Sequence, residues 1–144
     1  MTARRGVIAA VLGAVAVVVV AWLFGSARRY QEDLPAEFAG KRNPLGGAEA
    51  IAAGGRLFRE NCASCHGDGA DGHGPASVGL DPPPANFRSG TVLAKHSDAY
   101  LYYRVSTGKP GTAMPSFHGA LGETQRWEVV TYLRSLAAEA PGHP

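Results

Sequence analysis

Two cysteines, Cys62 and Cys65, lie three positions apart and are followed directly by His66. They are the only cysteines of the 144-residue chain, and a disulfide across so short a loop would restrict the unfolded chain little. The C-x-x-C-H pattern is typical of covalent haem attachment, in which each thiol forms a thioether with a vinyl group of the porphyrin. The histidine then lies beneath the iron as an axial ligand. The sequence therefore predicts a chain that folds around one covalently bound haem c.

Two other roles for the cysteine pair are open. A zinc site needs four ligands, and without a second cysteine pair it would have to recruit His66 or His73 in an unusual arrangement. A thioredoxin-like redox pair is expected between strands and helices, and this chain has no convincing strand pattern. Haem attachment is therefore the favoured hypothesis.

The chain offers few candidates for the sixth coordination position of such an iron. Its two methionines are Met1 and Met114, and the second lies 48 positions after His66 in an irregular stretch. Pro110 and Pro115 stiffen this stretch, so it can hold a side chain in place without a helix. Met114 is the predicted second axial ligand. The competing ligands, which are expected to face solvent, are His73, His96 and His118.

The amino-terminal segment can cross a bilayer. Residues 7–24 are apolar apart from one glycine, and two arginines flank the segment on each side. At about 1.5 Å per residue these 18 residues nearly match a hydrocarbon core of about 30 Å. Residues 1–27 are therefore predicted to form a transmembrane anchor. A cleaved secretory signal and a buried core helix are the alternatives, although signal cores are typically about 7 to 15 residues long.

The charge of the chain excludes one class of partner. The net charge is +2 overall, but from residue 30 onward ten basic residues stand against twelve acidic ones, which gives −2. A slightly acidic domain has no electrostatic reason to bind nucleic acid or an anionic bilayer surface. We therefore expect no nucleic-acid partner.

The remaining sequence divides into a tether and one domain. Residues 28–47 carry prolines and glycines without a sustained apolar period, and they are predicted to form an extracytoplasmic tether, either a plain linker or a segment that docks onto a partner. Residues 48–140 form the predicted domain. Its three clear helices are predicted over residues 48–62, 97–108 and 124–138. Gly54 indicates a close helix crossing, and Ser97 is a good N-cap.

A long stretch without helical or strand pattern separates the first two helices. Residues 67–95 are rich in glycine and proline, and a loop of this length is unusual inside a compact domain. A large, flat, apolar cofactor in the middle of the domain would account for it.

Residues 48–138 resemble a class I cytochrome c domain, an all-α fold of three to four short helices around a covalent haem. The matching pieces are Gly54 and Phe58, Cys62 to His66, Gly74-Pro75, Pro-Pro-Pro-Ala-Asn-Phe at 82–87, Gly-Thr-Ala-Met-Pro-Ser-Phe at 111–117, and the helix from Trp127 to Leu136. The resemblance implies that Gly54 and Phe58 face the last helix around residues 129–133. It also implies that the carbonyl of Pro75 accepts the Nδ1 proton of His66. The implied walls of the haem pocket are Pro84, Phe87, Leu101 and Phe117.

This resemblance implies a carrier of single electrons and not an enzyme. Histidine and methionine fill both axial positions, so oxygen cannot reach the iron without loss of a ligand. We expect relay between membrane redox complexes, as a free carrier or as a subunit of a respiratory or photosynthetic complex. Because bacterial haem attachment occurs on the outer face, the domain is expected on the periplasmic side of the cytoplasmic membrane. A haem enzyme or gas sensor with a labile Met114 is the alternative.

Overall fold

The computed structural model describes Val15 and residues 34–138. The predicted anchor, residues 1–27, lies outside the described residues apart from Val15. Among the residues that are described, no helix has both the length and the apolar character needed to cross a membrane.

The described part of the chain is built from helices and loops and contains no β-strand. Its helices are α2 (Gly47–Asn61), α3 (Ala63–His66), the 3-10 helix η1 (Pro75–Ser77), α4 (Thr91–Lys95), α5 (Asp98–Thr107) and α6 (Glu123–Ala138). The predicted all-α class is therefore confirmed, and α2, α5 and α6 match the three predicted helices to within about one residue.

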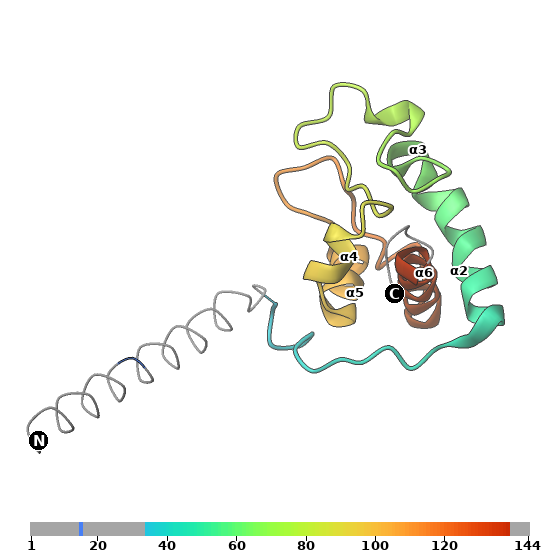
Figure 1. Ribbon diagram of the computed structural model, residues 1–144, viewed down its shortest axis with the longest axis vertical. Helices are drawn as coiled ribbons and strands as arrows, with labels where there is room; N and C mark the ends of the chain where they lie inside the picture. The colour runs from blue at the N-terminus through green and yellow to red at the C-terminus, as the bar shows by residue number, and fades with distance from the viewer. Residues whose placement is uncertain (1–14, 16–33, 139–144) are drawn as a thin grey trace, which may run out of the picture. The chain divides into compact units, whose positions relative to one another are not determined.

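The core of the domain is the crossing of α2 with α6, which lie side by side in Figure 1. A Cβ atom added to Gly54 would lie 1.9 Å from the carbonyl oxygen of Glu128, so only glycine permits this approach. Phe58 is 1% exposed, and its ring centroid lies 5.3 Å from that of Tyr132. Gly54 and Phe58 therefore face the last helix, as predicted.

The Gly54→Ala variant is expected to lower the free energy of unfolding by about 3 kcal/mol, because the added methyl group forces the two helices apart. Helix propensity alone would give the opposite sign, a gain of about 1 kcal/mol. Denaturant unfolding of the haem-loaded protein measures the difference. Gly119→Ala is the control, since a Cβ atom there would have no neighbour within 4 Å. A Gly54→Ala protein as stable as the wild type would contradict the close crossing.

Local sequence signals set the ends of α5. Ser97 is its N-cap, and the Ser97 hydroxyl accepts a hydrogen bond from the backbone N–H of Tyr100 at 3.2 Å. The helix ends at Gly108, whose φ of 71° is in the left-handed region that favours glycine. Both ends are as predicted.

The short helix α4 corrects the prediction that residues 67–95 contain no helix. It follows Gly90 in a left-handed conformation and buries Leu93, which is 2% exposed. A helix of five residues is too short to show an apolar period in the sequence. Its place is set by tertiary contact with α6 instead.

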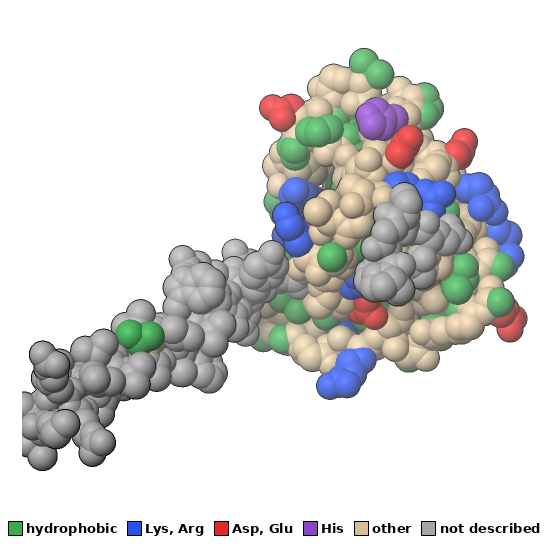
Figure 2. Space-filling model, viewed as in Figure 1, with side chains coloured by type: hydrophobic (Ala, Val, Ile, Leu, Met, Phe, Trp, Pro, Cys, Tyr) green, Lys and Arg blue, Asp and Glu red, His purple; other side chains and the backbone are tan. Residues whose placement is uncertain are grey.

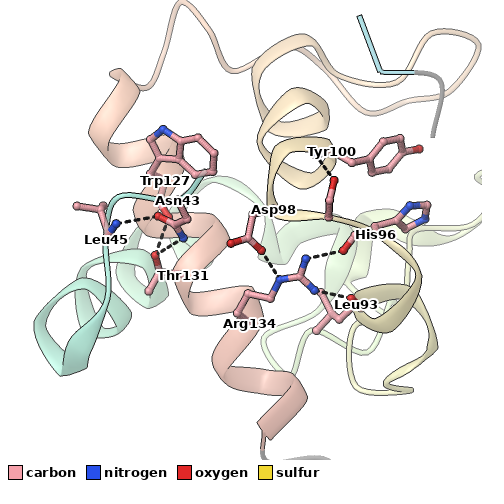
Figure 3. A network of polar contacts seen from close by, with 10 residues as sticks. Asn43, Leu45, Leu93, His96, Asp98, Tyr100, Trp127, Thr131 and Arg134 are labelled. Atoms are coloured by element: carbon pink, nitrogen blue, oxygen red, sulfur yellow. Dashed lines mark hydrogen bonds and ion pairs between the residues drawn. The ribbon is translucent and has the colours of Figure 1, made fainter. Parts of the chain in front are cut away.

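One arginine of α6 joins this helix to α4 and α5 (Figure 3). The Nε atom of Arg134 donates to the Asp98 carboxylate at 2.6 Å, and its two terminal nitrogens donate to the carbonyls of Leu93 and His96. One side chain thus satisfies two carbonyls at the C-terminal end of α4 and pairs with the acid in the first turn of α5.

Residues 34–46, which the sequence assigns to the tether, lie against the domain. The Asn43 side chain donates to the Thr131 hydroxyl at 2.9 Å, as Figure 3 shows. The ring of Phe38 lies 4.9 Å from that of Tyr103, centroid to centroid. Single residues make these contacts, and a single residue forms no periodic apolar pattern from which the packing could be predicted.

Candidate functional site

A cavity of about 430 Å³ opens in the domain. This volume is typical of small-molecule and cofactor sites. Its wall is formed by residues of α3, of the proline-rich loop (residues 82–87), of α5 and of the Met114 loop that follows α5 (residues 108–117). The predicted site residues on this wall are Cys62, Cys65, His66, Pro84, Phe87, Leu101, Met114 and Phe117. Of the predicted set only Pro75 is absent from the wall.

The two cysteines reach the cavity from the junction of α2 and α3. Cys62 ends α2 and begins α3, with its N–H bonded to the Phe58 carbonyl at 2.8 Å and its carbonyl bonded to the His66 N–H at 2.9 Å. Neither thiol is in a disulfide, and both residues are half-buried. Burial, together with the nearby Cys65, raises the pKa of the Cys62 thiol to about 12. In the polypeptide before any haem is attached, the Cys62 thiol is therefore protonated and uncharged at neutral pH.

His66 is held in one orientation at the end of α3. Its Nδ1 atom lies 3.1 Å from the carbonyl oxygen of Ala85, and its ring stacks on Phe87 with a centroid distance of 5.0 Å. A carbonyl only accepts hydrogen bonds, so Nδ1 carries the proton. Burial lowers the pKa of His66, and the bond to Ala85 opposes part of this effect. The imidazole is thus neutral at pH 7 with its Nε2 lone pair free, as a metal ligand must be.

The bond from His66 to Ala85 corrects the prediction that Pro75 accepts the Nδ1 proton. Pro75 is exposed at the start of η1. The preceding Gly74 lies against α3 instead: its N–H donates to the Cys65 carbonyl at 3.1 Å, and an added Cβ atom would lie 2.3 Å from the Ser64 carbonyl oxygen. Gly74 therefore packs on the backbone of α3, and the His66 imidazole forms its hydrogen bond with the proline-rich loop instead.

The loop that carries Met114 folds back onto the end of α5. The carbonyl of Met114 accepts from the Lys109 N–H at 3.2 Å, and the Phe117 N–H donates to the Val105 carbonyl at 3.2 Å. A Cβ atom on Gly108 would lie 2.6 Å from the Met114 carbonyl oxygen, so the close return of the loop needs glycine there. Backbone bonds to α5 fix the loop, in addition to the prolines named above.

The three competing histidines differ in position. His73 is exposed, with its side chain 81% accessible, and His118 is exposed with Nδ1 lying 3.0 Å from a nitrogen of Arg126. His96 is half-buried and lines the cavity, with its ring stacked 4.2 Å from that of Tyr100. The expectation that all three face solvent is therefore wrong for His96.

Arg104 is a wall residue that the sequence reasoning missed. Its guanidinium carbon lies 4.9 Å and 4.6 Å from the ring centroids of Tyr100 and Tyr103. Its Nε atom is buried without a hydrogen-bond partner, which is rare in native proteins. A ligand with an anionic group would complete its bonding. The sequence did contain a signal for Arg104 as a wall residue, because it lies three positions after the predicted wall residue Leu101 and so on the same face of the helix.

The comparisons with known proteins agree with this site. Residues 49–133 match the family described as cytochrome c oxidase, cbb3-type, subunit III. The chain belongs to this family. It is a class I cytochrome c with one covalently bound haem c, as the C-x-x-C-H pattern predicted. Two free thiols, a neutral histidine, apolar walls and an arginine with an unpaired donor fit that group.

Relatives of this cytochrome include proteins of two sizes. It is 34% identical to the cbb3-type cytochrome c oxidase subunit FixP of Bradyrhizobium sp. (strain ORS 278) over 85 residues, which are 59% of this chain and 27% of FixP. It is 34% identical to cytochrome c6 of Leptolyngbya boryana over 87 residues, 60% of this chain and 92% of that protein. The chain thus spans about a quarter of FixP and most of cytochrome c6.

One solved structure also resembles this cytochrome. It is a chain of the reducing HAO-like protein complex of Kuenenia stuttgartiensis, with 31% sequence identity and a TM-score of 0.54. The similarity covers 67% of this chain and 49% of that chain. The helical arrangement described above is therefore shared with a known protein of a multi-protein complex.

Proposed function

We propose that this cytochrome relays single electrons, with Cys62 and Cys65 bonded to the haem and with His66 and Met114 as the axial ligands of its iron. One observation carries the proposal: all four residues line a single cavity, although His66 and Met114 are 48 positions apart in the chain. The group bound there supplies a one-electron ferric–ferrous couple.

The side chains around the cavity suit relay better than catalysis. Ligands from both His66 and Met114 leave the iron no open position for a small substrate. A thioether ligand and apolar walls such as Phe87 and Leu101 favour the ferrous state and raise the reduction potential. Arg104 would hold a carboxylate of the bound group through its unpaired Nε atom.

The proposed setting is a membrane, with residues 1–27 as a single-pass anchor and the haem domain on the periplasmic side of the cytoplasmic membrane. The apolar run at residues 7–24 supports this arrangement. The names of the relatives support partners that are redox proteins, because FixP is a subunit of a cbb3-type oxidase and the Kuenenia protein belongs to a complex. By analogy, this chain delivers electrons as a subunit or close partner of such a complex.

The test uses the full chain, extracted from membranes in mild detergent. The absorption spectrum of the ferrous protein is expected to stay unchanged under carbon monoxide, because both axial positions are filled. Ready binding of carbon monoxide would contradict the relay and favour the alternative of a gas sensor or haem enzyme with a labile Met114. Chains that co-migrate in the same preparation identify the partner, and recovery in the soluble fraction without detergent would contradict the anchor.

A further inference from the structure

Arg126 of α6 is a buried cation that has no acidic partner within the described part of the chain. It is 6% exposed, and no carboxylate of the described residues lies within ion-pair distance of its guanidinium. Its Nη1 atom donates to the Ser106 hydroxyl at 2.7 Å and lies 3.0 Å from Nδ1 of His118, and its Nε atom donates to the Gly122 carbonyl at 3.4 Å. The guanidinium carbon also lies 5.0 Å from the ring centroid of Tyr102.

Burial of a charge with only neutral partners is costly. Shape alone does not call for an arginine here, since an apolar side chain of similar volume fills such a space without that cost. What the arginine adds is a fork of donors that reaches several acceptors at once. The positions of these acceptors in the fold therefore indicate the structural role of Arg126.

Two of the groups that Arg126 contacts flank the Met114 loop in the chain: Ser106 precedes the loop and His118 follows it. Ser106, 2% exposed, is in the last turn of α5, and its carbonyl accepts from the Ser116 hydroxyl at 2.7 Å and from the His118 N–H at 3.2 Å. His118 follows the loop directly. Arg126 thus joins α6, the end of α5 and the residues just after Met114 at one point.

We propose that Arg126 is a positioning residue that keeps the Met114 loop closed over the cavity and so sets the strength of the bond between Met114 and the ferric iron. This inference rests on the proposed ligation by Met114. The guanidinium acts through Ser106 and His118 and touches neither the iron nor its ligands. If it is removed, the end of the loop loses its link to α6, while the bonds from the loop to the α5 backbone remain.

The affinity of the ferric protein for added imidazole measures this effect. Imidazole binds only after the methionine sulfur has left, so its apparent affinity rises with the fraction of open loop. The Arg126→Leu variant is expected to bind imidazole at least about tenfold more tightly, the effect of losing hydrogen bonds to a charged group. Arg126→Lys, which keeps the charge but loses the fork, is expected to fall between this variant and the wild type.

Arg134→Leu is the matched control. Arg134 lies on the same helix and also bonds to other segments, but it reaches α4 and the start of α5 and not the Met114 loop. Its loss is expected to lower the midpoint of denaturant unfolding and to change the imidazole affinity by less than about twofold. Ser106→Ala removes the hydroxyl that accepts from Arg126 and keeps the guanidinium and the Ser106 carbonyl, and it is expected to shift the affinity in the same direction as Arg126→Leu.

Two outcomes would overturn the proposal. One is wild-type imidazole affinity in Arg126→Leu or, should that variant not fold, in Ser106→Ala. The other is an equal rise in Arg134→Leu, which would mark a general effect of stability. Failure of the ligation itself would look different, because the wild-type ferric protein would then lack the near-infrared absorption of thioether-bound haem iron before any substitution is made.

Discussion

Replacement of Cys62 and Cys65 together by serine is expected to abolish covalent haem and most of the tertiary structure. Both thiols border the cavity, and so do apolar residues such as Phe87 and Leu101. Without the cofactor, a cavity of about 430 Å³ stays unfilled in the middle of the domain, and the long glycine- and proline-rich loop has nothing to fold around. The free energy of unfolding, typically about 5 to 15 kcal/mol for a domain, is expected to fall close to zero.

Haem absorption in the purified protein and near-ultraviolet circular dichroism measure these two losses. Ser64→Ala is the control, because Ser64 lies between the cysteines, is exposed and is not a predicted haem ligand. It is expected to keep both haem and fold. A double-serine variant that stays compact and unfolds cooperatively without haem would show that side chains alone form the core.

The Met114→Ala variant is expected to keep its haem but lose the sixth ligand. Alanine has no donor atom, so the ferric iron takes water and becomes high-spin, and the ferrous iron binds carbon monoxide. Loss of the thioether also removes a ligand that stabilises the ferrous state, so the reduction potential is expected to fall by on the order of 100 mV. Spectra with and without carbon monoxide and a redox titration measure these effects.

His73→Ala is a suitable control for Met114→Ala, since the His73 side chain is 81% exposed and does not line the cavity. It is expected to match the wild type in spectrum and potential. An unchanged low-spin spectrum in Met114→Ala would assign the sixth position to another residue. His96 would then be the first candidate, because it is the competing histidine on the cavity wall.

The features that the sequence predicted well are those with local or highly specific signals. Ser97 and Gly108 mark the ends of α5 because capping depends on the residue itself. Gly54 predicted a helix crossing because a glycine inside a helix is costly without a close neighbour, and the Glu128 backbone is that neighbour. The cavity walls Pro84, Phe87, Leu101 and Phe117 came from the family resemblance, and all four line the cavity.

The features that the sequence did not predict depend on contacts between distant segments. Whether Ala85 or Pro75 receives the His66 proton is decided by how the proline-rich loop passes α3, and no periodicity encodes that path. Arg126 contacts His118 and Ser106, which are 8 and 20 positions away in the chain. Asn43 and Thr131, which form a hydrogen bond, are 88 positions apart in the chain. Because of contacts such as this one, part of the segment predicted as a tether packs against the domain.

The most direct test of the account is the intact mass of the mature protein, followed by fragmentation of the peptide that contains Cys62 and Cys65. The account predicts a mass greater than that of the polypeptide by one haem, with the added mass retained on this peptide under denaturing conditions. A mature protein with the mass of the bare polypeptide, or a haem that separates from the chain on denaturation, would contradict it.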